Sequence, residues 1–297
     1  MDNFKGTGVA MVTPFGEDLT VDFTALGNLV QHVTDGGVDF LVVMGTTAEA
    51  PTLTPKEKID VLEFVQANNA GNLPIVFGMG GNNTAALVEQ YKNFEHHVDA
   101  FLTVTPFYNR PNQRGLLKHY EAIADVSPKP IILYNVPKRT GTNMEAETVI
   151  ELSQHENIIG IKEASAGNFQ QLDEILAGVG KDFLVTSGDD DLIIPFMKHG
   201  GHGVISVIAN GLPKETSDLV ESAQNGDFGQ AGIDNQLLLP FLDLIFTEGN
   251  PTGVKSLLKT QGIGNGLLRL PLVEASHDLE TQIIKAFEKL GTKKGVL

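Results

Sequence analysis

The chain lacks cysteine altogether, and this absence excludes disulfide bonds, thiol catalysis and zinc or iron–sulfur sites with cysteine ligands. Basic side chains are also scarce, with 21 Lys and Arg against 37 Asp and Glu and a formal net charge of −16. The basic residues form no long run, so we expect no binding to nucleic acid or to an anionic membrane surface. Small metabolites remain the expected partners.

Long hydrophobic runs are missing as well. No segment of the 297 residues approaches the length of about 18 uncharged apolar residues at which a membrane-spanning helix becomes a candidate. The first residues pass directly into the strand-like segment 8–12, without the charged region and apolar stretch of a secretion signal. We therefore predict a soluble, cytoplasmic protein.

Short β-rich runs recur along the chain, and the segments between them are long enough for crossover helices. The runs are almost continuously apolar, which is typical of parallel strands buried on both faces. Several intervening segments open with helix-start signals, such as Thr54-Pro55 and Asn83-Thr84. The eight predicted strands are roughly 8–13, 39–45, 74–80, 100–106, 130–136, 158–164, 183–188 and 203–208. This pattern predicts an α/β fold, a (β/α)₈ barrel. An open, doubly wound sheet remains the alternative because sequence does not reveal closure.

From about Asp227 onward the pattern changes to helix-like segments, ending in an amphipathic stretch near 279–290. We predict a catalytic barrel over residues 1–226 and an appended C-terminal helical region over 227–297. No low-complexity linker separates the two, so the appended region should pack on the barrel or on a neighbouring subunit.

Lys162 closes the apolar run 158–164, which places a flexible amine at the end of a predicted buried strand. Strand alternation puts it on the same face as Gly160 and Ala164, which leaves space beside the nitrogen. An apolar pocket disfavours the charged form of an amine and frees its lone pair, and this is how Schiff-base lysines arise. The alternative is a strand-end lysine whose charged group reaches water.

Other polar residues follow predicted strands, at the end of the barrel where such enzymes carry their active sites. Thr46 and Thr47 can hold a carboxylate with backbone N–H groups and hydroxyls, or can merely cap a helix. Tyr108 and Tyr134 can relay protons, or can be core aromatics. Arg139 offers a planar guanidinium that matches a carboxylate, or is a solvated surface residue.

Four segments resemble, in order and nearly end to end, the dihydrodipicolinate synthase and N-acetylneuraminate lyase family of class I aldolases. They read GTTAE at 45–49, YNVPKRTG at 134–141, GIKEA at 160–164 and SGDD at 187–190. Arg139-Thr140-Gly141 is similar to the synthase branch of that family, as is the segment TVTPFYNRP at 103–111.

This resemblance implies that Lys162 forms an imine with the ketone of pyruvate, while Thr46 and Thr47 hold the pyruvate carboxylate. Tyr134 would complete the pocket and move protons in a relay with Thr47 and Tyr108. The iminium then serves as an electron sink, so the methyl group of pyruvate can lose a proton and attack an aldehyde. No metal and no organic cofactor is required by such a mechanism.

The resemblance further implies that Arg139 grips the carboxylate of L-aspartate 4-semialdehyde and that Gly188 and Ile205 line the site, the latter through its main-chain carbonyl. In this family the residue at the position of Tyr108 reaches into the adjacent subunit, which implies a homo-oligomer, a dimer of dimers. The sibling alternatives are an N-acetylneuraminate lyase or a 2-keto-3-deoxy sugar acid aldolase. They would form the same imine but would bind the second substrate with other residues than Arg139. A non-catalytic barrel is a third hypothesis. It is disfavoured because the chain keeps the lysine nucleophile, both tyrosines and the arginine that would bind the second substrate.

Two departures from the family pattern have consequences. Ala48 stands where the family has glycine, and a left-handed backbone at this position would cost on the order of 1 kcal/mol. Feedback-regulated members bind lysine with polar groups, and of the corresponding positions here only Asn82 remains suitable. Those positions are Ala50, Pro51, Pro55, Lys58, Asn82, Ala86 and Phe107. We therefore expect activity that is insensitive to lysine.

The acidic run Asp189-Asp190-Asp191 is the remaining motif that could carry chemistry. Three carboxylates could hold magnesium, but the run has no evident partners in the sequence. We favour the interpretation that these residues cap the helix after the seventh strand and compensate its dipole.

Overall fold

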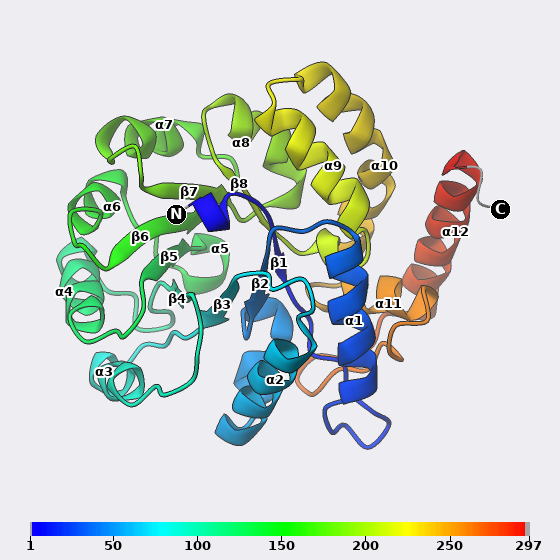
Figure 1. Ribbon diagram of the computed structural model, residues 1–297, viewed down its shortest axis with the longest axis horizontal. Coiled ribbons are helices and arrows are strands. Elements are labelled where there is room, and N and C mark those ends of the chain that lie inside the picture. The colour runs from blue at the N-terminus through cyan, green and yellow to red at the C-terminus, as the bar shows by residue number, and fades with distance from the viewer. Residues whose placement is uncertain (1, 295–297) are drawn as a thin grey trace.

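In the computed structural model, which describes residues 2–294, eight parallel strands close into a barrel in the order β1 to β8 (Figure 1). Strand β8 pairs with β1, so the closed barrel is confirmed and the open sheet is excluded. The strands are β1 (Gly6–Ala10), β2 (Phe40–Val43), β3 (Ile75–Gly78), β4 (Ala100–Val104), β5 (Ile131–Asn135), β6 (Ile158–Glu163), β7 (Leu184–Ser187) and β8 (Gly203–Ser206).

Helices surround the barrel and continue beyond it. The α-helices are α1 (Phe23–Asp35), α2 (Pro55–Asn68), α3 (Thr84–Lys92), α4 (Gln113–Ala124), α5 (Pro137–Thr140), α6 (Ala146–Leu152), α7 (Phe169–Gly178), α8 (Ile193–Lys198), α9 (Pro213–Gln224), α10 (Phe228–Thr247), α11 (Thr252–Thr260) and α12 (His277–Lys294). Single 3₁₀ turns are η1 (Asp2–Phe4), η2 (Thr46–Ala48), η3 (Ala50–Thr52), η4 (Asp190–Leu192) and η5 (Ile208–Asn210).

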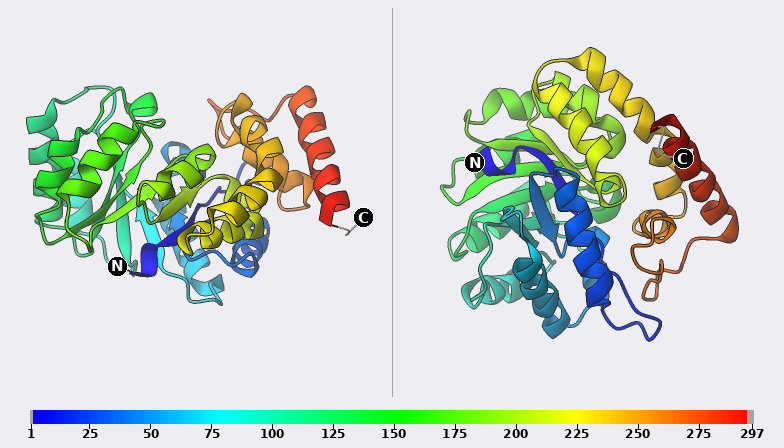
Figure 2. Two further views of the ribbon diagram at one scale, coloured as in Figure 1. Left: turned by 90° about the horizontal axis from the view of Figure 1, so that it is seen from above. Right: turned by 45° about the vertical axis from the view of Figure 1, so that its right-hand side comes forward.

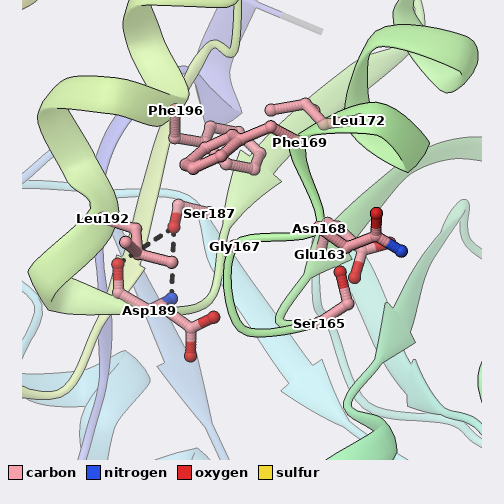
Figure 3. A pocket seen from close by; sticks show the side chains of 10 residues that line it. All are labelled: Glu163, Ser165, Gly167, Asn168, Phe169, Leu172, Ser187, Asp189, Leu192 and Phe196. Atoms are coloured by element: carbon pink, nitrogen blue, oxygen red, sulfur yellow. Dashed lines mark hydrogen bonds between the residues drawn. The ribbon is translucent and has the colours of Figure 1, made fainter.

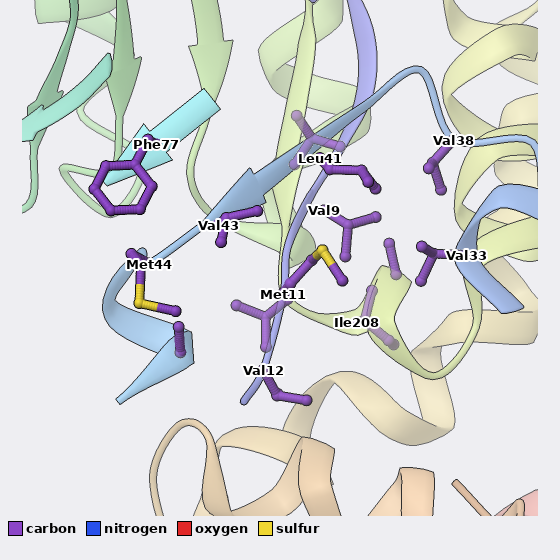
Figure 4. Close-up of a cluster of buried hydrophobic side chains, with 14 of the residues drawn as sticks. Val9, Met11, Val12, Val33, Val38, Leu41, Val43, Met44, Phe77 and Ile208 are labelled. Atoms are coloured by element: carbon purple, nitrogen blue, oxygen red, sulfur yellow. The ribbon is translucent and has the colours of Figure 1, made fainter. Parts of the chain in front are cut away.

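The apolar strands are buried on both faces because alternate residues face different hydrophobic clusters. In β2, Leu41 and Val43 belong to the large cluster between the strands and the helices, part of which Figure 4 shows. Phe40 and Val42 belong to the smaller cluster inside the barrel, together with Tyr134. This two-sided burial explains why the strands read as unbroken apolar runs.

The predicted helix starts are confirmed by their capping contacts. Thr54 and Glu57 form a capping box at α2, in which each side chain bonds to the backbone N–H of the other residue. The Asn83 side chain accepts the backbone N–H of Ala86 at the start of α3.

The C-terminal helices α10 to α12 lie together on one side of the barrel, away from α3 to α6, in both Figure 1 and the left view of Figure 2. Helix α10 packs against α9 of the barrel and against α11 and α12. The appended helical region is therefore confirmed, while its division from the barrel at residue 226 stays a prediction. Within residues 2–294, no helix combines the length and apolar character needed to span a membrane.

Candidate active site

Lys162 and Tyr134 face each other inside the barrel. They are register partners on the adjacent strands β6 and β5, so their side chains project from the same face of the sheet. Both are buried, with exposed fractions of 4% and 7%. The Lys162 Nζ atom lies 4.6 Å from the centroid of the Tyr134 ring. The predicted nucleophile and one predicted proton carrier are thus brought together.

Gly188, which follows β7, lies directly against the Lys162 side chain. A Cβ atom at this position would lie 2.8 Å from Lys162 Cε and 2.6 Å from the Cβ of Ala164. Both distances are too short for non-bonded carbon atoms, so a larger residue here would displace the lysine. Ile205, on β8, is fully buried in the same interior cluster as Tyr134. The structure therefore places Gly188 and Ile205 at the barrel interior with the lysine and the tyrosine.

The turn after β2 carries the two threonines on the 3₁₀ turn η2. Thr46 is exposed, whereas Thr47 is buried and its Oγ1 accepts a hydrogen bond of 2.9 Å from Asn250 Nδ2. Because this bond occupies a lone pair of the hydroxyl, the Thr47 proton remains free for another acceptor. The condition for strain at Ala48, a left-handed backbone, is not met, since Ala48 lies in the right-handed turn and the left-handed φ of 56° falls on Glu49.

Tyr108 and Arg139 do not join this group within the chain. The Tyr108 side chain is 90% exposed, and its φ of 71° is unusual for a residue other than glycine. Its loop is held in place, because Asn82 Nδ2 donates to the carbonyl of Phe107 and Asn109 Nδ2 donates to the carbonyl of Asn82. Arg139 lies exposed on α5, and its guanidinium has no ion pair or hydrogen bond within residues 2–294. Both side chains are therefore available to a ligand or to another subunit.

Behind the lysine, on the outer face of β6, Glu163 lies in a polar network. Asn135 Nδ2 and Gln171 Nε2 donate to its carboxyl group. Burial raises the pKa of Glu163 to about 6, although these hydrogen bonds act in the opposite direction. Glu163 also lines a narrow pocket between β6, β7 and the following helices, where Figure 3 shows Phe169 and Phe196 on one side and Asp189 on another. This pocket lies outside the barrel wall, whereas Lys162 points to the inside.

The interpretation of the acidic run as a helix cap is wrong. The side chain of Asp189 makes no capping bond and instead accepts the backbone N–H of Ala166. Asp190 is buried and accepts the backbone N–H groups of Val207 and Ile208, so it fixes the turn after the next strand, β8. Burial raises the pKa of both carboxyl groups. In the part of the chain described, no group of three or more His, Asp or Glu side chains is arranged to hold a metal ion.

Sequence reasoning missed the contribution of the C-terminal region to this site. Asn250 contacts Thr47, and Lys255 forms a buried ion pair with Glu49, the residue that ends the threonine turn. The only available signal was weak, because Lys255 lies close to the apolar residues Val254 and Leu257 in α11 and gives no indication of its distant partner.

This arrangement is suited to the chemistry of a carbonyl compound. A buried amine beside a tyrosine hydroxyl can add to a ketone while the phenol transfers protons to and from the reacting oxygen. The threonine turn, which follows β2 at the same end of the barrel, offers backbone N–H groups and hydroxyls for an anionic group.

Comparisons with known proteins agree with this geometry. The model of the dihydrodipicolinate synthetase family matches residues 3–290. The 4-hydroxy-tetrahydrodipicolinate synthase of Parabacteroides distasonis is 48% identical over 98% of this chain and 98% of its own length. That of Flavobacterium psychrophilum is 47% identical over 95% and 97%. The crystal structure of the chloride-inhibited dihydrodipicolinate synthase of Acinetobacter baumannii, complexed with pyruvate, is 35% identical with a TM-score of 0.92, covering 97% of this chain and 99% of that one.

Proposed function

The chain belongs to the dihydrodipicolinate synthetase family and is a lyase, and from this premise we propose that it condenses pyruvate with L-aspartate 4-semialdehyde to give 4-hydroxy-tetrahydrodipicolinate. This reaction would supply the synthesis of diaminopimelate and lysine. The observation that carries the proposal is the buried Lys162 amine, which lies over the Tyr134 ring with Gly188 against its side chain.

The reaction begins when the Lys162 amine adds to the ketone of pyruvate and water is lost, which leaves a positively charged imine. The iminium withdraws electrons, so a methyl proton of pyruvate leaves and an enamine forms. The enamine carbon attacks the aldehyde carbon of the semialdehyde, and the aldehyde oxygen takes up a proton. The amino group of the semialdehyde then attacks the imine carbon, which closes the ring and releases the lysine.

Each proposed role is supported by a position in the fold. Thr46 and Thr47 bind the pyruvate carboxylate from the turn after β2, and Tyr134 transfers protons to the ketone-derived oxygen that leaves as water and to the aldehyde oxygen. Gly188 and Ile205 line the site, Ile205 through its main-chain carbonyl. These residues lie at or just after the carboxyl ends of their strands, which is the end of the barrel where such enzymes carry their catalytic residues.

Tyr108 takes part in proton transfer from the neighbouring subunit. Its side chain is 90% exposed within one chain, which supports this role. A tyrosine that transfers protons in a site shielded from water must itself be covered, and here only another subunit can cover it. The enzyme is accordingly a homo-oligomer, with a dimer as the smallest active unit and a dimer of dimers as the expected assembly. We place it in the cytoplasm, with no nucleic-acid or membrane partner.

Replacing Arg139 with alanine is expected to raise the KM for the semialdehyde by roughly 10- to 100-fold, because a charge-assisted bond to a carboxylate contributes about 1.5–3 kcal/mol. The KM for pyruvate should change far less. Steady-state kinetics with each substrate varied in turn measures both values. Lys138→Ala is the matched control, since Lys138 is an exposed cation on the same short helix.

The same experiment separates the proposed reaction from its siblings. An N-acetylneuraminate lyase or a 2-keto-3-deoxy sugar acid aldolase would form the same imine but would bind its second substrate through residues other than Arg139. Equal changes in both KM values for Arg139→Ala, or turnover of a sugar acid by the unaltered enzyme, would favour a sibling.

Lysine is expected to leave the activity unchanged. None of the seven positions that correspond to the family's lysine site is acidic, and Lys58 adds a positive charge there. The amide of Asn82 is already bonded to the carbonyl of Phe107. Initial rates measured with increasing lysine at fixed ionic strength test this expectation. Half-inhibition by sub-millimolar lysine would contradict it.

A further inference from the structure

The turn that carries Thr46 and Thr47 is fixed by residues from the far end of the chain. Asn250 Nδ2 donates to Thr47 Oγ1 across 203 residues of sequence. Lys255 Nζ donates to Glu49 Oε1 at 2.5 Å across 206 residues. Both partners come from the C-terminal region, and both meet the turn within three residues of each other.

The ion pair between Glu49 and Lys255 is buried, and each of its two groups makes a further hydrogen bond. The exposed fractions of the two side chains are 0% and 3%. The second oxygen of Glu49 accepts the backbone N–H of Arg269 at 3.0 Å. The Lys255 amine also donates to the carbonyl of Leu267 and lies 4.2 Å from the centroid of the Phe15 ring. The carboxylate is thus held at both oxygens by groups of the C-terminal region.

This pair matters for the electrostatics of the adjacent turn. Burial lowers the pKa of Lys255 to about 8, while the Glu49 carboxylate acts in the opposite direction and supports the charged amine. Without Lys255, a buried negative charge would remain two residues from Thr47 and would repel any anion bound at the turn. The Glu49 side chain, whose backbone is left-handed, would also keep only one of its two anchors, the N–H of Arg269.

We propose that Lys255 is a positioning residue for the carboxylate of pyruvate. It neutralises and anchors Glu49, and thereby keeps the N–H groups and hydroxyls of Thr46 and Thr47 in the arrangement that binds the substrate. The inference rests on the proposed function, because it takes this turn to be the pyruvate carboxylate site. Its consequence is that a residue of α11, outside the barrel, sets the affinity for pyruvate without taking part in the chemistry.

The test is reductive trapping of the pyruvate imine with borohydride in the full-length enzyme, at a series of pyruvate concentrations. For Lys255→Met, which keeps an unbranched side chain one heavy atom shorter and removes its charge, we expect the half-saturating pyruvate concentration to rise about tenfold or more. The maximal extent of labelling at Lys162 should be retained. A residue that serves only the stability of the fold would lower the melting temperature and leave the half-saturating concentration unchanged.

A second variant keeps the test decisive if Lys255→Met does not fold, because that variant leaves an unpaired carboxylate in the interior. The double variant Glu49→Gln/Lys255→Met removes both charges, and its amide oxygen can still accept the N–H of Arg269. We expect it to fold and still to need about tenfold more pyruvate, since the amine that anchors the turn is gone.

Lys259→Met is the matched control. Lys259 lies one turn further along α11 and forms an ion pair of 2.5 Å with Glu280 of α12, away from the threonine turn. Its replacement should leave the half-saturating pyruvate concentration unchanged. If the folded Lys255 variants also saturate at the concentration of the unaltered enzyme, the inference is overturned. Failure of the proposed function itself is distinct, because the unaltered enzyme would then form no adduct at Lys162 or, as a sibling aldolase, would form the adduct without turning over L-aspartate 4-semialdehyde.

Discussion

Replacing Lys162 with alanine is expected to lower kcat at least about 1,000-fold, because the reaction then has no amine to form the imine. Treatment with pyruvate and borohydride should add the mass of the reduced pyruvate adduct to the unaltered protein and nothing to the variant. Peptide mapping should confine the adduct to the peptide that contains Lys162. The side chain is nearly fully buried, so the variant's melting temperature should be measured alongside the activity.

The control is Lys181→Ala, since Lys181 is an exposed lysine at the start of the segment that leads into β7, at the opposite end of the barrel. This variant should keep both its turnover and its adduct. Activity that survives in a folded Lys162→Ala enzyme, or an adduct on another lysine, would remove the basis of the proposed mechanism. Lys255 is the other lysine to inspect in the peptide map, because it is buried with a lowered pKa.

Replacing Tyr134 with phenylalanine is expected to lower kcat by roughly 100- to 10,000-fold, which is the usual contribution of a positioned general acid–base group. The substitution keeps the ring that lies 4.6 Å from the Lys162 amine and removes only the hydroxyl. The imine should therefore still form, but more slowly. Steady-state rates at saturating substrates, together with the rate of reductive trapping, distinguish slow proton transfer from loss of the site.

Tyr120→Phe provides the comparison for this variant. Tyr120 is fully buried and its hydroxyl donates to the carbonyl of Thr103, so the change also removes one buried hydroxyl. It should lower stability by about 1 kcal/mol and leave the turnover of the folded enzyme unchanged. A Tyr134→Phe enzyme that keeps its kcat within a few-fold would show that protons reach the imine by another route.

The fold and the centre of the site were predictable because both depend on short-range patterns. All eight strands were placed from apolar runs, since strands buried on both faces leave no polar alternation to confuse the pattern. Lys162 and Tyr134 end consecutive strands, and consecutive strands of a parallel barrel are neighbours, so their meeting followed from chain order. Their proposed roles, imine formation for Lys162 and proton transfer for Tyr134, came from the family resemblance together with this placement.

The parts that escaped prediction depend on contacts between distant segments. Asp190 was expected to cap its own helix, but it accepts N–H groups of the turn after β8, and no local pattern indicates that choice. Glu49 and Lys255 looked like ordinary charged residues until the fold buried them together. Charged residues are rarely buried unless paired, and sequence does not reveal which pairs will form.

The separation of 206 residues between Glu49 and Lys255 has a consequence for biosynthesis. At synthesis rates of roughly 5–20 residues per second, a ribosome needs about 10–40 s to add the cation after the carboxylate has been made. During this interval the nascent barrel contains an acidic side chain whose burial is not yet compensated. The turn after β2 is therefore expected to reach its final form only after α11 has been synthesised, later than the strands that precede it in the chain.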